Sequence, residues 1–292
     1  MTDDQTTRRG LDSQTPNVAR IWDYQLGGKD NYAADRHAAD VLNAACHQVG
    51  APDGRDIARE NRQFIHRAVA HLADAGITQF IDIGAGLPSQ GNVHEIAQAV
   101  RPDATVVYVD YDEVVLSHGR ALLATNPSTT VIQADLRQPK DILTDPDLTR
   151  LIDLTQPVAV LLVAVLHLLT DEEDPAGIVT TLRAALAPGS ALVLTHVTGD
   201  LRPGLAETVA NQFTRLGVTT PLVPRSADQI RGFFTGLDGV EPGLVQPALW
   251  RPTPDTQPAT RWMYAGVGRL PHTEPDTQTS HAAPQADPGA TA

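Results

Sequence analysis

The stretch from residue 77 to residue 93 constrains the fold most, because it joins a short apolar strand to a glycine-rich turn. Its first half, I-T-Q-F-I-D-I, predicts a buried strand ending at Ile83. Gly84 and Gly86 follow, and a residue without Cβ accepts positive φ and lets a ligand approach the main chain. A helix opening near Asn92 would point its free N–H groups into the same space. The stretch therefore predicts a nucleotide site at the carboxyl end of a parallel strand.

This turn has two interpretations. A dinucleotide fingerprint, G-x-G-x-x-G, needs its third glycine at position 89, where the sequence has Ser89 preceded by Pro88. The second interpretation includes Asp82 and reads D-x-G-x-G. Together with an acidic residue at the end of the next strand, this pattern resembles motif I of the class I S-adenosylmethionine-dependent methyltransferases.

Composition limits the classes of function. The 292 residues, 41% of them hydrophobic, can bury a sizeable core, and we expect one large domain. A formal net charge of −13 argues against a broad surface for nucleic acid or anionic lipid. Cys46 is the only cysteine, which excludes an internal disulfide framework and a multi-cysteine zinc site. No signal-peptide pattern or membrane-spanning run is visible, so we expect a cytoplasmic protein. The histidines are scattered and have no carboxylates at ligand spacing, so we expect no metal site.

Acidic residues follow the next two predicted strands. The strand T-V-V-Y-V-D ends in Asp110, about twenty residues after the glycine turn, where a carboxylate can accept hydrogen bonds from ribose hydroxyls. A solvated strand-end aspartate is the alternative. Tyr111 could lie against an adenine or simply pack. The strand T-T-V-I-Q leads to Asp135, which is placed to accept from an adenine amino group.

The fourth strand, P-V-A-V-L-L-V, has no polar alternation, which is typical of a central strand covered on both faces. It brings Ala164 and His167 to the same edge of the sheet. His167 could act as a general base or simply bond a nearby carbonyl, and His196, at the end of the fifth strand, is an equal candidate for the base. Less distinct strands are expected at 240–245 and 261–268.

Helical periodicity precedes the first strand. It predicts helices from residue 17 to about 26, from 33 to about 49 and from 56 to about 75. Arg62 lies on the apolar stripe of the third helix instead of its solvent face. A charge placed there needs a partner, which is either a structural ion pair, for example with Asp82, or the carboxylate of a ligand.

Several long segments, in order, resemble the actinobacterial family called S-adenosyl methyltransferase. They are A-R-I-W-D-Y-Q-L-G-G-K-D-N-Y-A-A-D-R, E-N-R-Q-F-I-H-R-A-V, F-I-D-I-G-A-G-L-P-S-Q-G-N-V-H-E, V-V-Y-V-D-Y-D and L-L-V-A-V-L-H. The resemblance covers about residues 17–268 and implies a class I fold with seven strands, the last antiparallel. It also implies S-adenosylmethionine at the ends of the first strands. Leu87-Pro88 departs from the usual continuation of the glycine loop, which leaves the contacts to the methionine part open.

The resemblance also places the Gly-Gly-Lys-Asp-Asn segment near the cofactor. One interpretation is a lid on which Tyr24 packs against the cofactor while Asn31 or Arg62 reaches the methionine carboxylate. The other is an ordinary helix–loop–helix that covers an edge of the sheet. We assign the cofactor site to the following residues: Tyr24, Gly28, Asn31, Arg62, Asp82, Gly84, Ala85, Gly86, Asp110, Tyr111, Ala134, Asp135, Leu136 and Ala164.

The expected organisation is an α/β, Rossmann-like chain in four parts. These are a disordered start (1–15), an N-terminal helical lid (16–76), a methyltransferase core (77–269) and a disordered tail (270–292). The predicted function is methyl transfer from S-adenosylmethionine to the oxygen, nitrogen or sulfur of a small molecule. The alternatives are a non-catalytic S-adenosylmethionine-binding regulator and an NAD-dependent oxidoreductase. A homodimer is a further expectation, with no nucleic-acid or membrane partner.

Overall fold

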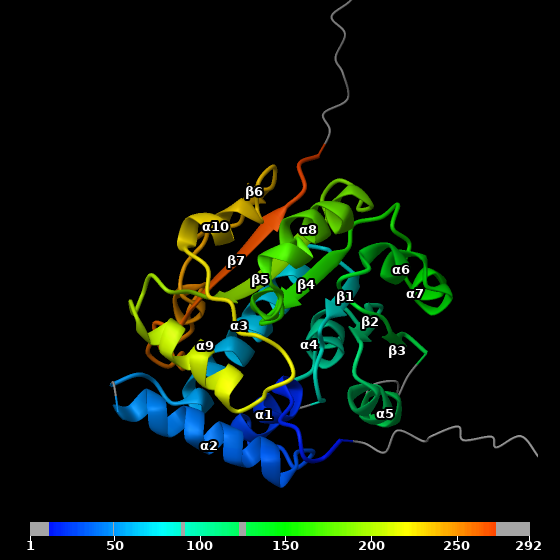
Figure 1. Cartoon of the computed structure of the whole chain (residues 1–292). Helices are drawn as coiled ribbons and strands as arrows, with labels where there is room; N and C mark the ends of the chain where they lie inside the picture. The colour runs from blue at the N-terminus through cyan, green and yellow to red at the C-terminus, as the bar shows by residue number, and fades with distance from the viewer. Residues whose placement is uncertain (1–11, 49, 89–90, 123–126, 273–292) are drawn as a thin grey trace, which may run out of the picture.

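The computed structural model describes residues 12–48, 50–88, 91–122 and 127–272, which form a seven-stranded sheet with helices on both faces (Figure 1). The strand order is β3-β2-β1-β4-β5-β7-β6. The strands are β1 Gln79–Ile83, β2 Thr105–Asp110, β3 Thr129–Gln133, β4 Ala159–Val163, β5 Ala191–Val197, β6 Asp238–Gly239 and β7 Met263–Arg269.

Helices precede the first strand and connect the later ones. The α-helices are α1 Val18–Gln25, α2 Ala33–Gln48, α3 Gly54–Asp74, α4 Val93–Val100, α5 Glu113–Leu122, α6 Pro139–Thr144, α7 Pro146–Leu151, α8 Pro175–Ala184, α9 Leu205–Arg215 and α10 Ala227–Gly232. Three short 3-10 helices are η1 Leu166–Leu168, η2 Asp171–Glu173 and η3 Pro247–Leu249. None of the helices in the described ranges is both long and apolar enough to cross a membrane.

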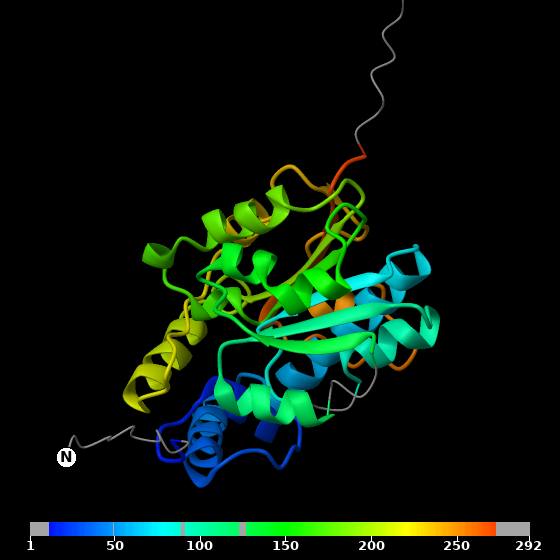
Figure 2. The same ribbon diagram turned by 90° about the vertical axis from the view of Figure 1, so that its right-hand side faces the viewer.

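Alternate residues of each strand supply two separate cores. Phe80, Val106 and Leu161 face helices α3, α4 and α5, and this core includes Phe64 edge-on to Trp250. Their neighbours in sequence point to the other face, where α6, α7, α8 and α10 pack. Figure 2 shows the green helices on one side of the sheet and the blue and cyan helices on the other. Both faces are covered, so the central strands carry apolar residues in both directions, as the fourth strand predicted.

The five strands β1 to β5 are parallel, and β7 runs antiparallel to β5 and β6. This confirms the predicted class I methyltransferase sheet with its reversed last strand. Parallel pairing also gathers the carboxyl ends of β1 to β5 at one edge. In Figure 1, α1, α2 and α9 lie together beyond that edge.

One predicted strand is wrong. Residues 240–245 do not form a strand; β6 is only Asp238–Gly239, and Val245 makes an isolated bridge to Ala265. Pro242 has no amide donor for a ladder, and Gly243 has φ +81°, outside the extended region. Val240 N–H donates to the Val267 oxygen and Val245 bridges Ala265, but the turn between Val240 and Gly243 separates these two contacts with β7.

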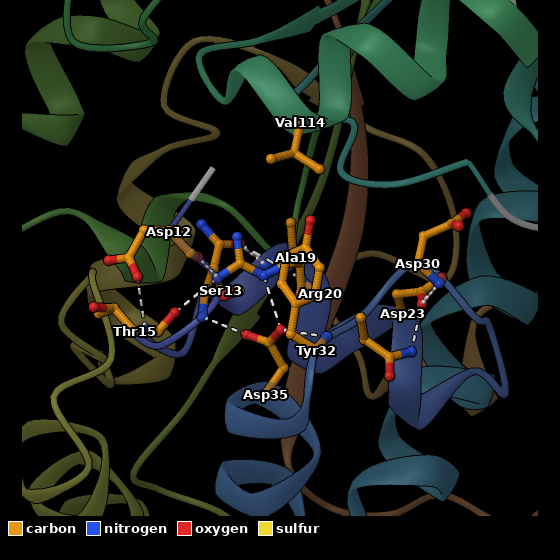
Figure 3. Close-up of polar contacts among 12 residues, drawn as sticks. Asp12, Ser13, Thr15, Ala19, Arg20, Asp23, Asp30, Tyr32, Asp35 and Val114 are labelled. Atoms are coloured by element: carbon orange, nitrogen blue, oxygen red, sulfur yellow. Dashed lines mark hydrogen bonds and ion pairs between the residues drawn. The ribbon is translucent and has the colours of Figure 1, made fainter. Parts of the chain in front are cut away.

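The start of the chain is anchored by Arg20, as Figure 3 shows. The Arg20 guanidinium donates to the carboxylate of Asp35 at 2.8 Å and to the main-chain oxygens of Asp12 and Thr15. Residues 12–15 of the expected disordered start are therefore bonded to α1, whereas residues 1–11 lie outside the described residues. Of the expected disordered tail, residues 270–272 are described, and Leu270 N–H donates to the Ser190 oxygen; the remainder lies outside them.

The Arg20–Asp35 pair gives a test of how the N-terminal helices are held. Arg20→Leu leaves the fully buried Asp35 carboxylate without its cation, and we expect the free energy of unfolding to fall by about 3 kcal/mol. Arg150→Leu, which removes an exposed pair with Asp147, is the matched control and should cost under about 1 kcal/mol. Urea unfolding measures both. Equal losses would show that the buried pair does not hold this segment.

Candidate functional site

A cavity of about 250 Å³ lies at the carboxyl edge of the parallel strands. Its wall is built by the glycine turn after β1, the segments that follow β2, β3 and β4, and the last residue of β5. Helices α1, α2, α3 and α9 contribute the opposite side. The ends of strands that are distant in sequence thus meet in one concave site, as expected for a ligand site in an open α/β sheet.

The glycine turn is fixed by hydrogen bonds to the second strand. Gly86 N–H donates to the Asp110 carboxylate at 2.9 Å, and Asp112 N–H donates to its other oxygen at 3.0 Å. Gly84 and Gly86 both have positive φ, at +74° and +65°, and a Cβ at Gly84 would lie 2.6 Å from a methyl group of Val165. The turn therefore requires glycine, and it holds Asp110 against the cavity.

Asp82 and Arg62 form the electrostatic centre of the cavity wall. Burial raises the pKa of Asp82 to about 7, with Arg62 opposing the rise and Asp110 adding to it. Burial lowers the pKa of Arg62. Arg62 makes no hydrogen bond and no ion pair with any residue in the described ranges, although it lines the cavity. Arg62 and Asp82 therefore do not form an ion pair at contact distance, and the guanidinium can donate to an anionic group of a ligand.

The far end of the cavity has one apolar and one acidic wall. Tyr111, Ala134 and Leu136 line it, and the Tyr111 side chain is 47% exposed. Asp135 also lines it, but its carboxylate is bonded by Arg137, with 2.6 Å between Nη2 and Oδ2. A ligand amino group there would share Asp135 with Arg137, because a carboxylate has about four acceptor positions.

Beyond β4, a chain of hydrogen bonds orients an asparagine that the sequence did not reveal. Ala164 has φ +56°, and its N–H donates to the Thr195 hydroxyl at 2.9 Å. That hydroxyl donates in turn to Asn61 Oδ1 at 2.7 Å. Asn61 is buried and lines the cavity beside Arg62. The sequence feature that could have indicated Asn61 is its position beside Arg62 on the apolar face of the helix.

The two candidate bases differ in position. His167 lines the cavity, and its Nδ1 accepts from Val197 N–H at 3.3 Å, so the ring proton lies on Nε2. His196 is not among the described lining residues, and both its nitrogens are bonded, Nδ1 to the Val197 oxygen and Nε2 to Arg225. Burial lowers the pKa of His167 well below its usual range and that of His196 to about 3. Of the two, only His167 lines the cavity, and in the tautomer that accepts from Val197 N–H its Nε2 carries the proton.

The N-terminal segment reaches the cavity through α1 and not through the loop after it. Of the predicted residues, Tyr24, Gly28 and Asn31 are not among the described lining residues. Tyr24 donates to Asp40, while Asn31 donates to Asp23, whose carboxylate also packs against Gly28.

Other residues of the N-terminal segment line the cavity instead of Tyr24, Gly28 and Asn31. Among them are Asn17, Trp22 and Asp23, which the sequence did not indicate as site residues. Asn17 caps α1 with its side-chain oxygen and donates through Nδ2 to the Asp112 carboxylate at 2.9 Å. This bond joins the N-terminal helices to the end of β2. The sequence does not indicate this distant partner, because the helix-capping role of an asparagine already explains its presence at that position.

A family model described as S-adenosyl methyltransferase matches residues 4–271 of the chain. The chain belongs to the S-adenosyl methyltransferase family. The resemblance deduced from the sequence segments is thereby confirmed. S-adenosylmethionine is the cofactor of this methyltransferase, and the dinucleotide interpretation of the glycine turn does not hold.

Solved structures agree with this assignment. A DUF574 family protein from Streptomyces avermitilis is 39% identical, with a TM-score of 0.82 over 90% of this chain and 100% of its own. A proposed methyltransferase from Thermobifida fusca is 42% identical, with a TM-score of 0.81 over 92% and 100%. An O-methyltransferase family protein from Burkholderia thailandensis, 15% identical with a TM-score of 0.51 over 76% and 61%, shares the fold alone. No curated protein matched this methyltransferase.

The raised pKa of Asp82 predicts a specific pH dependence of stability. The folded methyltransferase holds this proton up to about pH 7, whereas an unfolded aspartate releases it near pH 4. The folded state therefore binds more protons between these values, and the contribution of Asp82 to stability is lost as pH rises through this window. We expect the free energy of unfolding of Asp82→Asn, relative to the wild type, to increase from pH 4 to pH 7. Parallel pH profiles would contradict the assignment.

Proposed function

We propose that this methyltransferase transfers the methyl group of S-adenosylmethionine to an oxygen, nitrogen or sulfur of a small molecule, at the cavity described above. The observation that carries the proposal is that Arg62, which has no partner among the described residues, lies in the same cavity as Asp110. One residue offers a cation for a carboxylate, and the other offers acceptors for ribose hydroxyls. S-adenosylmethionine carries both a carboxylate and ribose hydroxyls, so these two residues fit the cofactor.

Other lining residues would bind the remaining parts of the cofactor. Asp110 would accept from the ribose, and Tyr111 and Leu136 would contact the adenine, with Asp135 accepting from its amino group. The glycine turn, Gly84 to Gly86, would lie against the cofactor with its main chain. Arg62 would bind the methionine carboxylate, with Asn61 beside it.

S-adenosylmethionine supplies a methyl group on a positively charged sulfur, which is already a strong electrophile. The residues of the chain therefore need to align the acceptor and exclude water, not to activate the methyl group. Helix α1 suits the second task, because it covers the cavity and is tied to the core through Asn17 and Asp112.

The lid interpretation remains part of the proposal in a revised form. The turn that contains Gly28 and Asn31 is held by Asp23, which itself lines the cavity. Asp30 adds an ion pair with His118 of α5, 3.4 Å apart. In this form, α1 is the part of the lid that closes over the cofactor. The turn after it is linked to α1 through Asp23, and it would stabilise the closed position of α1 without contacting the ligand.

A labelling experiment tests the proposed reaction. The protein is incubated with S-adenosylmethionine labelled in its methyl group and with fractions of an actinobacterial small-molecule extract. We expect label in a small molecule and an equal amount of S-adenosylhomocysteine. Asp110→Ala should lower both by about tenfold at subsaturating cofactor, because hydrogen bonds to a charged acceptor contribute about 1.5–3 kcal/mol. Tight cofactor binding without transfer to any fraction would contradict methyl transfer and favour a regulator.

A further inference from the structure

The half of the cavity nearest β5 differs in chemistry from the half nearest β2. We call it the acceptor chamber and define it by six lining residues: Leu42, Cys46, Ile57, Val209, Phe213 and Trp262. They come from α2, α3, α9 and the residue before β7, and they pack into one apolar cluster. Ala164, which follows β4 and also lines the cavity, packs against this cluster.

Charged residues in the cavity lining come from a limited set of elements. They belong to α1, to α3 through Arg62, and to the ends of β1, β2 and β3. Within the described lining, no Lys, Arg, Asp or Glu comes from α2, from α9 or from the residues next to β5 and β7. An anionic or cationic ligand group would lose its hydration there without gaining a partner, at a cost of several kcal/mol. The chamber therefore discriminates against ions.

Two uncharged polar groups in the cavity lining have no partner within the described ranges, whereas Gln25 and Asn43, which also line it, bond each other. His167 is 3% exposed and lines the cavity, and its protonated Nε2 makes no hydrogen bond with any residue that the structure describes. The Thr220 hydroxyl oxygen is buried in the lining, also without a partner in the described ranges. Buried polar groups normally have partners, so both are candidates to bond a ligand.

The position of His167 is rigidly maintained. Arg225 is buried and donates to the main-chain oxygens of Leu166 and Leu169, each at 3.0 Å, on either side of the histidine. It also pairs with Asp171 at 2.7 Å. Val197 N–H fixes the tautomer from the opposite side. The donor is thus preorganised before any ligand arrives.

We propose that the acceptor chamber binds a neutral, mainly apolar methyl acceptor, and that His167 Nε2–H donates a hydrogen bond to a carbonyl or hydroxyl oxygen of it. This inference rests on the proposed function and specifies its substrate class. Thr220 bonds a second polar atom of the same molecule. In this proposal His167 is a substrate-binding residue. Because Val197 N–H fixes its tautomer, His167 acts as a hydrogen-bond donor and not as the general base that the sequence suggested.

Three probes of nearly equal shape test the proposal. Acetophenone carries a carbonyl acceptor, α-methylstyrene replaces that oxygen by a CH₂ group, and benzoate is an anion. Ligand-observed NMR titrations are run on the full chain with saturating S-adenosylhomocysteine, whose own binding is measured in parallel by calorimetry. We expect acetophenone to bind at least tenfold more tightly than benzoate. Equal or tighter binding of benzoate would overturn the neutral chamber.

Variants separate the hydrogen bond from packing. His167→Leu should weaken acetophenone about five- to tenfold and leave α-methylstyrene unchanged, and His167→Gln, which keeps a donor, should restore much of the loss. Equal weakening of both probes would overturn the donor role. If the Leu variant does not fold, the ¹⁵N resonance of Nε2 in the wild type serves instead, and it should move with acetophenone only.

A chamber-filling variant locates the probes. Val209→Trp should abolish acetophenone binding and leave S-adenosylhomocysteine binding unchanged, because Val209 lies on α9 in the chamber wall. Unchanged acetophenone binding in this variant would overturn the location. Failure of the wild type to bind S-adenosylhomocysteine would instead count against the proposed function, so the two failures are distinguishable.

Discussion

The hydrogen bond from Gly86 N–H to the Asp110 carboxylate joins the first strand's turn to the end of the second strand. It exists because β1 and β2 are parallel neighbours in register, Ile83 opposite Val109, so both strands end at the same height. Asp110 is buried, and burial raises the pKa of its carboxyl group, which the two amide donors counteract. A carboxylate held in this way by main-chain groups presents its remaining lone pairs to the cavity.

Charge in the cavity is divided along the sheet edge. The β1–β3 end collects Asp82, Asp110 and Asp135, with Arg62 as a cation not paired within the described residues. The β4–β5 end carries neutral groups whose orientation is set by hydrogen bonds from the main chain or from Thr195. A cofactor with a charged amino-acid end and an acceptor of low polarity would each find a matching half. In the proposed arrangement, methyl transfer would take place where the halves meet, near Ala164.

The sequence predicted the parts of this arrangement that depend on local pattern. The glycine turn and Asp110 followed from strands that end in specific residues, and parallel pairing brought those ends together. Arg62 could be singled out because a charge on an apolar helix stripe conflicts with its surroundings. Residues 240–245 do not form the predicted strand, because the turn at Pro242 and Gly243 interrupts pairing with β7.

Other residues were beyond the reach of sequence patterns. The tautomer of His167 depends on Val197 N–H, thirty positions away, and Asn17 finds Asp112 across 95 positions. The N-terminal loop attracted attention through its Gly-Gly pair, yet the cavity wall is made by the helix before it. Long-range hydrogen bonds of this kind leave no periodic trace in a sequence.

The central claim is that Arg62 binds the methionine carboxylate, and Asp110 the ribose, of one S-adenosylmethionine molecule. The most direct measurement compares Arg62→Leu with wild type by calorimetry, using S-adenosylmethionine and 5′-methylthioadenosine, which lacks the amino-acid part. Arg59→Leu, an exposed position on the same helix, is the control. The account predicts a loss of about 10- to 100-fold for S-adenosylmethionine and almost none for 5′-methylthioadenosine. Equal losses for the two ligands, or no loss for either, would contradict it.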